Sequence, residues 1–259
     1  MDILVCFKLS PDSKDILVSN GAINTDRAEW NVGEYDLVAV EAAAQLAAAT
    51  GRKLIGVSVG GSQLANTRFR KNMLSRGCDS LSLVMNDALV QADTHKTAVA
   101  LAAAVTEIGN YDLIVCGEGS QDLYFRQTGI QLGELLGLPV INGISALNGI
   151  EGSVLLAERS TDSGIEVLEI PLPAVVCVTS DICQSRIPKM KDILQAGRKP
   201  VKELDAAGIP CDATGSEIIK VALPKSVQRK AVNFSGTPEE IADQIVAMLA
   251  KEGLMPGGM

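Results

Sequence analysis

Short continuous runs of apolar residues alternate along this chain with longer stretches that have helical spacing. Apolar runs without strict alternation are typical of strands that are covered on both faces of a parallel sheet. Five such runs predict strands, at 3–9, 54–59, 80–85, 112–116 and 174–179. Four stretches between them predict helices that close near a glycine, at 35–50, 64–76, 94–109 and 126–137. The alternation predicts an α/β fold with a doubly wound, mostly parallel sheet and right-handed crossovers.

The pattern changes in the second half of the chain. Residues 155–176 predict a small antiparallel hairpin that turns at 161–164. A basic, proline-containing stretch follows at about 184–200, and its composition is equally typical of a solvated linker. Thr237 and Glu240 form a capping-box pattern that opens an amphipathic helix. We therefore expect an α/β domain over 1–200 and, over 201–259, a C-terminal arm whose helix packs on another protein.

Composition and charge exclude several classes of function. The 259 residues are 47% hydrophobic, which allows a substantial core, and the net charge is −8. That charge and an aromatic content of 3% argue against a nucleic-acid-binding protein. No uncharged apolar run approaches the roughly 18 residues that a membrane span needs. The N-terminal stretch carries acidic residues too early for a signal peptide, so we expect a cytoplasmic protein without membrane insertion.

The six cysteines fit that compartment. Cys6, Cys116 and Cys177 lie inside predicted strands, where a thiol behaves as a small apolar side chain. Cys78, Cys183 and Cys211 are scattered, and no CxxC pair suggests a zinc or redox site. Structural cysteines are the expectation.

Side chains for acid–base or nucleophilic catalysis are scarce. His95 is the single histidine and lies at a predicted helix start, where a surface or capping role is the more common one. Without it no Ser/His/Asp or Cys/His arrangement can be assembled, and GxSxG and Walker-type loops are missing. The sequence therefore does not indicate an enzyme with catalytic residues of its own.

Glycines at two strand ends suggest a binding site instead. Gly60 and Gly61 end the strand at 54–59, where small residues allow a phosphate to approach the backbone, although tight strand–helix turns use glycine anyway. Residues 117–129 follow the strand at 112–116 and contain two glycines, an acid and Arg-Gln-Thr-Gly. Arg126 is suited to pairing with a phosphate and Asp122 to accepting a ribose hydroxyl. A turn with a helix cap explains this second junction about equally well.

At this junction the chain resembles the beta subunits of electron transfer flavoproteins, through Gly117, Asp122 and 127–129. Three further segments agree in order and spacing: the opening strand with its lysine at 3–8, an aromatic and an acid before Ala-x-Glu-x-Ala at 35–43, and 172–200. The likeness covers about residues 1–202 and is closest to a diverged bacterial branch.

The resemblance implies a Rossmann-like, adenine-nucleotide-binding protein that works beside a larger alpha subunit. The two subunits share one FAD, and the smaller one carries AMP or, in some members, a second FAD. The implied pocket consists of Cys6, Phe7, Val59, Gly60, Asp122, Arg126, Gln127 and Thr128, with Tyr35 near the FAD held by the alpha subunit. Arg186, Ile187 and Met190 match a partner-docking loop. Such a heterodimer carries electrons from a flavin dehydrogenase, for example an acyl-CoA dehydrogenase, to a quinone oxidoreductase or another acceptor.

Several residues depart from the family pattern. Leu123 and Tyr124 stand where further acidic or small residues are common, Arg126 replaces a small or amide residue, and Gly33 stands where asparagine is common. The altered loop favours AMP over a second FAD. The alternative is a stand-alone adenine-nucleotide sensor of the universal-stress-protein type, which explains the glycine loops but neither the basic loop nor the capped C-terminal helix.

Overall fold

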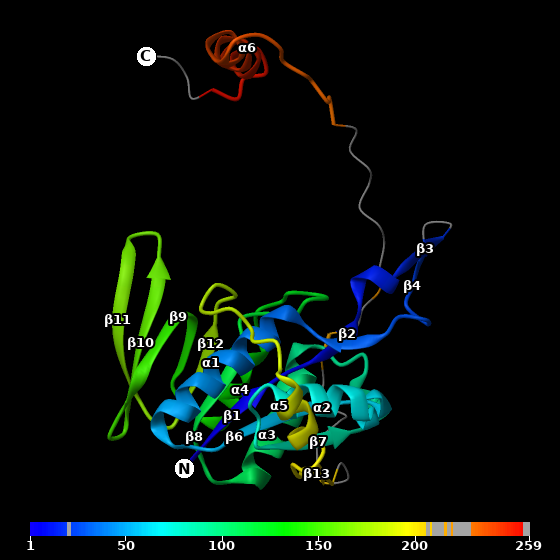
Figure 1. The fold of residues 1–259 in the computed structure, drawn as a ribbon, viewed down its shortest axis with the longest axis vertical. Coiled ribbons are helices and arrows are strands. Elements are labelled where there is room, and N and C mark those ends of the chain that lie inside the picture. The colour runs from blue at the N-terminus through cyan, green and yellow to red at the C-terminus, as the bar shows by residue number, and fades with distance from the viewer. Residues whose placement is uncertain (20–21, 206–207, 209–214, 217–218, 220–228, 256–259) are drawn as a thin grey trace. The chain divides into compact units, whose positions relative to one another are not determined.

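The computed structural model describes residues 1–19, 22–205, 208, 215–216, 219 and 229–255. Cys211 lies outside these residues. The chain divides into two units, Met1–Val221 and Ala222–Met259. In the first unit a nine-stranded sheet has the order β11-β10-β9-β12-β8-β1-β6-β7-β13 (Figure 1). The seven strands from β9 to β13 in this order run parallel, and β10 and β11 pair antiparallel, which confirms the predicted fold class.

The sheet strands are β1 (Asp2–Cys6), β6 (Leu54–Gly60), β7 (Ser80–Met85), β8 (Tyr111–Gly117), β9 (Val140–Glu151), β10 (Val154–Thr161), β11 (Gly164–Pro171), β12 (Ala174–Val178) and β13 (Val201–Leu204). Two small antiparallel pairs join β2 (Leu9–Pro11) to β5 (Trp30–Val32) and β3 (Leu17–Ser19) to β4 (Ala22–Asn24). The helices are α1 (Glu34–Thr50), α2 (Thr67–Ser75), α3 (Thr94–Ile108), α4 (Thr128–Leu136), α5 (Met190–Ala196) and α6 (Pro238–Lys251), with 3-10 turns η1 (Ser13–Asp15), η2 (Ser62–Ala65) and η3 (Asp87–Leu89).

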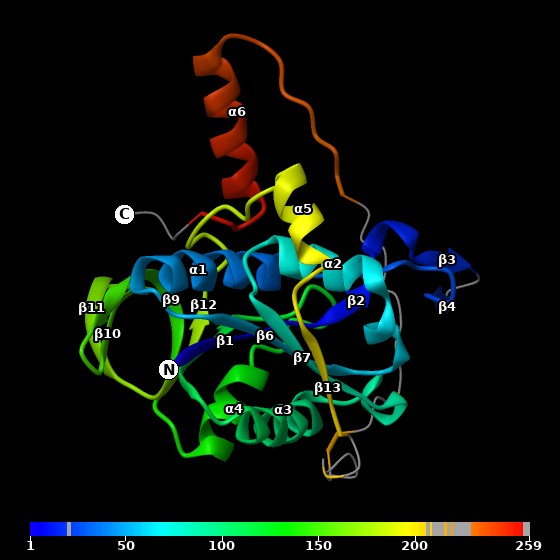
Figure 2. The same cartoon turned by 60° about the horizontal axis from the view of Figure 1, so that its bottom comes forward.

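Helices cover both faces of the parallel sheet, as Figure 2 shows. On one face α1 and α2 pack against alternate residues of the central strands, among them Ile3 and Val115. On the other face α3 and α4 cover the intervening residues, such as Leu4 and Ile114. Burial on both faces explains why the strands are continuous apolar runs in the sequence.

Local capping chemistry sets the helix boundaries. The Asn66 side chain accepts a hydrogen bond from the backbone N–H of Arg68, so the predicted helix at 64–76 is split into η2 and α2. The helix predicted at 126–137 begins only at Thr128, because Arg126 has a φ of 58° in the left-handed region. Gly137, with a φ of 65°, ends that helix as expected.

The strand predicted at 3–9 ends early, at Cys6. Beyond it the backbone N–H of Lys8 donates to the carboxylate of Asp36, 2.9 Å away, so the chain leaves the sheet. The next residues form β2, which pairs with β5 in a separate two-stranded sheet.

The second half of the first unit holds one confirmed element and two additions. β10 and β11 form the predicted hairpin, with Asp162 and Ser163 between the strands. We expected the arm to begin at residue 201, but 201–204 form β13, which pairs with β7 at the edge of the sheet. The 184–200 stretch contains α5, a short helix that its composition does not predict.

The second unit contains helix α6. Thr237 and Glu240 form the reciprocal capping box, and Pro238 is the first helical residue, as predicted. Its apolar positions Ile241, Ile245 and Met248 recur at the spacing of one helix face.

The strand order places a switch point beside β1. The chain runs from β1 outward to β6 and β7, then returns to β8 on the opposite side of β1. In open α/β sheets ligands bind outside the carboxyl ends of strands at such a point. Cys6 ends β1 and Gly117 ends β8, so the fold directs attention to these two residues.

Candidate functional site

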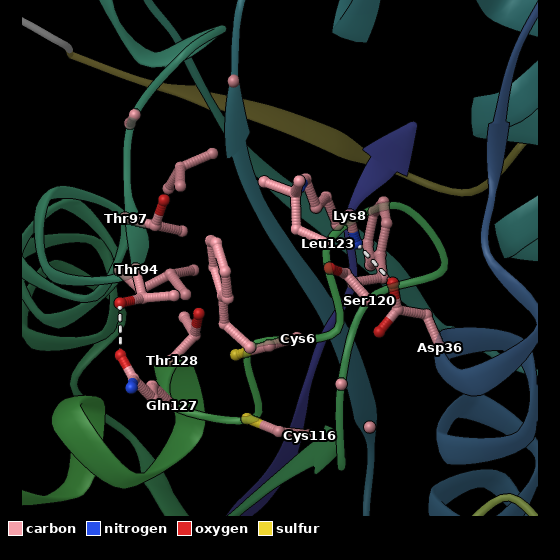
Figure 3. A pocket seen from close by; sticks show the side chains of 18 of the residues that line it. Cys6, Lys8, Asp36, Thr94, Thr97, Cys116, Ser120, Leu123, Gln127 and Thr128 are labelled. Carbon is pink, nitrogen blue, oxygen red and sulfur yellow. Dashed lines mark hydrogen bonds between the residues drawn. The ribbon is translucent and has the colours of Figure 1, made fainter. Parts of the chain in front are cut away.

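A cavity of about 440 Å³ opens at the carboxyl ends of β1, β6 and β8, at the switch point (Figure 3). Its size lies within the range of small-molecule sites. The sulfur atoms of Cys6 and Cys116 lie on one side of it, and side chains from the starts of α3 and α4 lie on another. Apolar walls with a few polar groups are the usual character of a ligand site.

Most of the residues named from the sequence line this cavity. They are Cys6, Phe7, Val59, Gly60, Arg126, Gln127 and Thr128. Asp122 and Tyr35 lie beside the lining instead. The carboxylate of Asp122 accepts from the Lys8 ammonium at 2.6 Å, and the ring of Tyr35 packs against the tilted ring of Tyr124 with 5.0 Å between centroids.

The loop between β8 and α4 is held in an unusual conformation. Tyr124 and Arg126 have φ values of 48° and 58°, which cost energy for residues other than glycine. The Arg126 guanidinium pairs with Glu118 at 3.2 Å and lies 5.7 Å from the centre of the Tyr124 ring. Tyr124 and Arg126, two residues at which the sequence departs from the resemblance, therefore contact each other.

The part of the polar lining that α3 contributes was not predicted from the sequence. Thr94 and Thr97, at the start of α3, line it, and the Thr94 hydroxyl donates to the Gln127 side chain at 3.1 Å (Figure 3). Asp93 caps α3 by accepting from the backbone N–H of Lys96. Two helix N-termini, those of α3 and α4, thus border one cavity, an arrangement that favours anions. One feature of the sequence could have predicted the contribution of α3: Asp93, a residue type that favours helix starts, follows the strand predicted at 80–85.

His95 follows Thr94 but is not part of the lining.

A buried carboxyl group lies at the edge of the cavity. Asp36, in the first turn of α1, is 8% exposed and lines the cavity. Burial raises its pKa to about 7, although the hydrogen bond from the Lys8 backbone N–H opposes the rise. This group changes its charge near neutral pH.

Three thiols cluster beneath the start of α4. Cys6, Cys116 and Cys177 are buried and carry no disulfide, as expected. The hydrogen bond with Cys116 and burial raise the pKa of the Cys177 thiol well above its usual range. A β-carbon added at Gly129 would meet the sulfur of Cys177, so this position needs glycine. The thiols act here as packed apolar groups.

The residues named for partner docking lie elsewhere, on the stretch that includes α5. Ile187 and Met190 are 90% and 72% exposed. Arg186 directs its guanidinium to Glu41 of α1, with Nη2 2.9 Å from Oε1. The Arg186 side chain is therefore held against α1, while the side chains of Ile187 and Met190 are exposed to solvent.

Two further observations concern the described part of the chain only. Among those residues, His, Cys, Asp and Glu nowhere gather in a group of three suited to a metal ion. Within the same residues, none of the helices has the length and apolar character needed to cross a bilayer.

The fold and the site define a class: a doubly wound α/β protein with a ligand-sized cavity at its switch point, bordered by two helix N-termini. The family follows from a direct comparison. The model of the electron transfer flavoprotein domain matches residues 20–208, more than half of the chain. The chain belongs to the electron transfer flavoprotein domain family.

Proposed function

We propose that this chain is the beta subunit of an electron transfer flavoprotein and works as a heterodimer with a larger alpha subunit. The heterodimer carries electrons from a flavin dehydrogenase, such as an acyl-CoA dehydrogenase, to a quinone oxidoreductase or another acceptor. The family match over 20–208 supports electron carriage. The amphipathic pattern of α6 supports a second protein chain, because a helix of this kind gains stability by covering its apolar face.

The cavity at the switch point is the observation that carries the nucleotide part of the proposal. Its apolar walls suit an adenine ring, and the N-termini of α3 and α4 suit a phosphate. Thr94, Gln127 and Thr128 line the cavity beside these helix starts and support phosphate binding there, with Arg126 as a further lining cation. The residues therefore fit an adenine nucleotide, and we propose AMP.

Preference for AMP over a second FAD rests on the loop between β8 and α4. Tyr124 packs on Tyr35, and Arg126 pairs with Glu118, so bulky side chains replace the small ones common in the family. A flavin shared with the alpha subunit supplies the redox chemistry when bound. The residues of this chain position that cofactor, bind the nucleotide and recognise the donor.

Mass spectrometry of nucleotides released by denaturing the purified chain tests the proposal. We expect AMP from the chain expressed alone, and FAD only after co-expression with the alpha subunit. FAD from the chain alone would overturn the assignment of AMP. ATP with no flavin under either condition would refute the electron carrier and support the stand-alone nucleotide sensor.

A matched variant links the nucleotide to the cavity. Thr94→Val removes the hydroxyl that lies between α3 and Gln127 while keeping the shape of the side chain. We expect less AMP per chain in this variant than in Thr106→Val, whose hydroxyl donates to the Ala102 carbonyl on the exposed surface of α3. Equal nucleotide content in the two variants would contradict the assignment of the phosphate side.

A further inference from the structure

The stretch between β12 and β13 presents apolar side chains to solvent. Ile187, Met190 and Leu194 are 90%, 72% and 71% exposed. Lysines at 189 and 191 lie between them in sequence. We call residues 186–199 the docking segment. Its exposed apolar groups and cations fit a partner surface with an apolar socket and carboxylates around it.

A buried carboxylate of α1 holds the beginning of this segment. Glu41 is 5% exposed. Its two oxygens accept from the Arg186 guanidinium, with Nη2 2.9 Å from Oε1 and Nε bonded to Oε2, and the Arg186 backbone N–H adds a bond of 3.3 Å. Gln45, one turn further along α1, donates to Glu41 at 2.7 Å. A bidentate pair of this kind fixes direction as well as distance.

Glu41 stays ionised in this setting. Burial works toward a higher pKa, but hydrogen bonds from Arg186 and Gln45 outweigh it and lower the pKa of Glu41 below its usual value. The clamp between Glu41 and Arg186 is therefore charged throughout the neutral range.

Further contacts hold the segment at both ends. Arg76, the residue that follows α2, donates to the backbone carbonyl of Arg186, so the backbone N–H and carbonyl of Arg186 are both hydrogen-bonded. At the other end the Lys199 ammonium donates to the carbonyls of Leu74 and Cys78, 2.9 Å and 2.7 Å away. The exposed apolar residues lie between these two attachments.

The segment also forms one wall of a second cavity. Ile187, Pro188 and Ile193 line a groove of about 760 Å³ together with Trp30 and Phe69. The groove keeps its shape only while the segment stays in place, because the two walls come from distant parts of the chain.

We propose that the Glu41–Arg186 clamp positions the docking segment for the donor flavin dehydrogenase, so that Arg186 acts through placement of Ile187 and Met190. This inference rests on the proposed function. A segment already held in its binding conformation avoids the entropy loss of ordering on contact, which otherwise weakens association. Loss of one partner would also leave a buried charge unpaired, so the clamp resists partial opening.

Limited trypsin digestion of the purified chain tests the clamp without any partner. Glu41→Gln keeps the shape of the side chain but removes the charge and one acceptor. We expect cleavage after Lys189 and Lys191, followed by peptide mass spectrometry, to be about tenfold faster in this variant, since hydrogen bonds to charged groups are worth a factor of this order. Arg186→Lys retains a cation and should give an intermediate rate.

Asp112→Asn is the matched control. It breaks another largely buried ion pair, Arg52 to Asp112 at 2.9 Å, which lies outside the docking segment. The control should cleave at the wild-type rate after Lys189 and Lys191. Equal rates in Glu41→Gln and the wild type, or an equal acceleration in the control, would overturn the clamp.

A second measurement tests docking in the heterodimer. An acyl-CoA dehydrogenase reduced by its acyl-CoA serves as donor, and the heterodimer concentration is varied. We expect Glu41→Gln to raise KM about tenfold with kcat unchanged, because the chemistry after docking is the same. Faster trypsin cleavage with unchanged KM would refute the docking role. A wild-type heterodimer that accepts no electrons would count against the proposed function, while the digestion would still decide the clamp.

Discussion

Asp36 offers a quantitative test of the electrostatics at the cavity. Its carboxyl group is buried at the start of α1 and receives one backbone hydrogen bond, from Lys8. Replacement by asparagine keeps an acceptor for that bond and removes the ionisation. We expect Asp36→Asn to stabilise the fold at neutral and alkaline pH.

The size of the effect follows from the pKa. Burial raises the pKa of Asp36 from 3.8 to about 7, so the folded state holds a proton that the unfolded state has lost between those two values. The contribution of Asp36 to the free energy of unfolding is therefore fully present below pH 3.8. It falls as pH rises and is lost above about pH 7. Three pKa units correspond to about 4 kcal/mol, at roughly 1.4 kcal/mol per pH unit across the window.

Urea unfolding followed by the fluorescence of Trp30, the single tryptophan, measures this difference. The free energy of unfolding of the variant minus that of the wild type should grow from pH 4 to pH 7 and level off above. A pH-independent difference for Asp36→Asn would refute the reasoning, because the carboxyl would then titrate equally in both states.

Three smaller changes test other contacts. Gly129→Ala places a β-carbon against the Cys177 sulfur and should cost about 1–3 kcal/mol in urea unfolding; an unchanged midpoint would contradict the packing. Asp93→Ala removes the cap of α3 and should cost about 1 kcal/mol in urea unfolding; an unchanged midpoint would contradict the role of this cap. Lys8→Met removes a partly exposed pair with Asp122 and should cost less than about 1 kcal/mol. Burial works to raise the pKa of Asp122, but the hydrogen bond from the Lys8 ammonium helps to keep it below its usual value. Lys8→Met should therefore raise the pKa of Asp122, and a carbon-13 NMR titration would measure this rise.

Local patterns in the sequence predict the parts of the fold that depend on local physics. Continuous apolar runs predict buried strands, and the Thr237–Glu240 pattern predicts the start of α6. β13 is a different case, because Val201 pairs with Leu81, 120 residues earlier, and nothing near either residue signals the contact. Pairing across that distance depends on the assembled sheet.

The site shows the same division. Glycines at the ends of β6 and β8 indicate the cavity, since the carboxyl ends of parallel strands meet at one edge of the sheet. Thr94 and Asp36 escape such an interpretation because each lies on a helix whose approach to the cavity depends on packing. The positive φ of Tyr124 is likewise invisible in sequence, since aromatic residues seldom adopt it.

Helix α1 connects the two regions on which the proposals rest. Asp36 lies in its first turn at the cavity, and Glu41 lies five residues on, roughly 7–8 Å along the axis, at the docking segment. The two carboxyl groups have opposite pKa shifts: burial dominates at Asp36, while the Arg186 guanidinium overcomes it at Glu41. A rise in pH through 7 therefore places a negative charge beside the cavity and leaves the clamp unchanged. We therefore expect the binding of the proposed nucleotide to weaken as pH rises through 7, while the placement of the docking segment stays the same, although one helix carries both carboxyl groups.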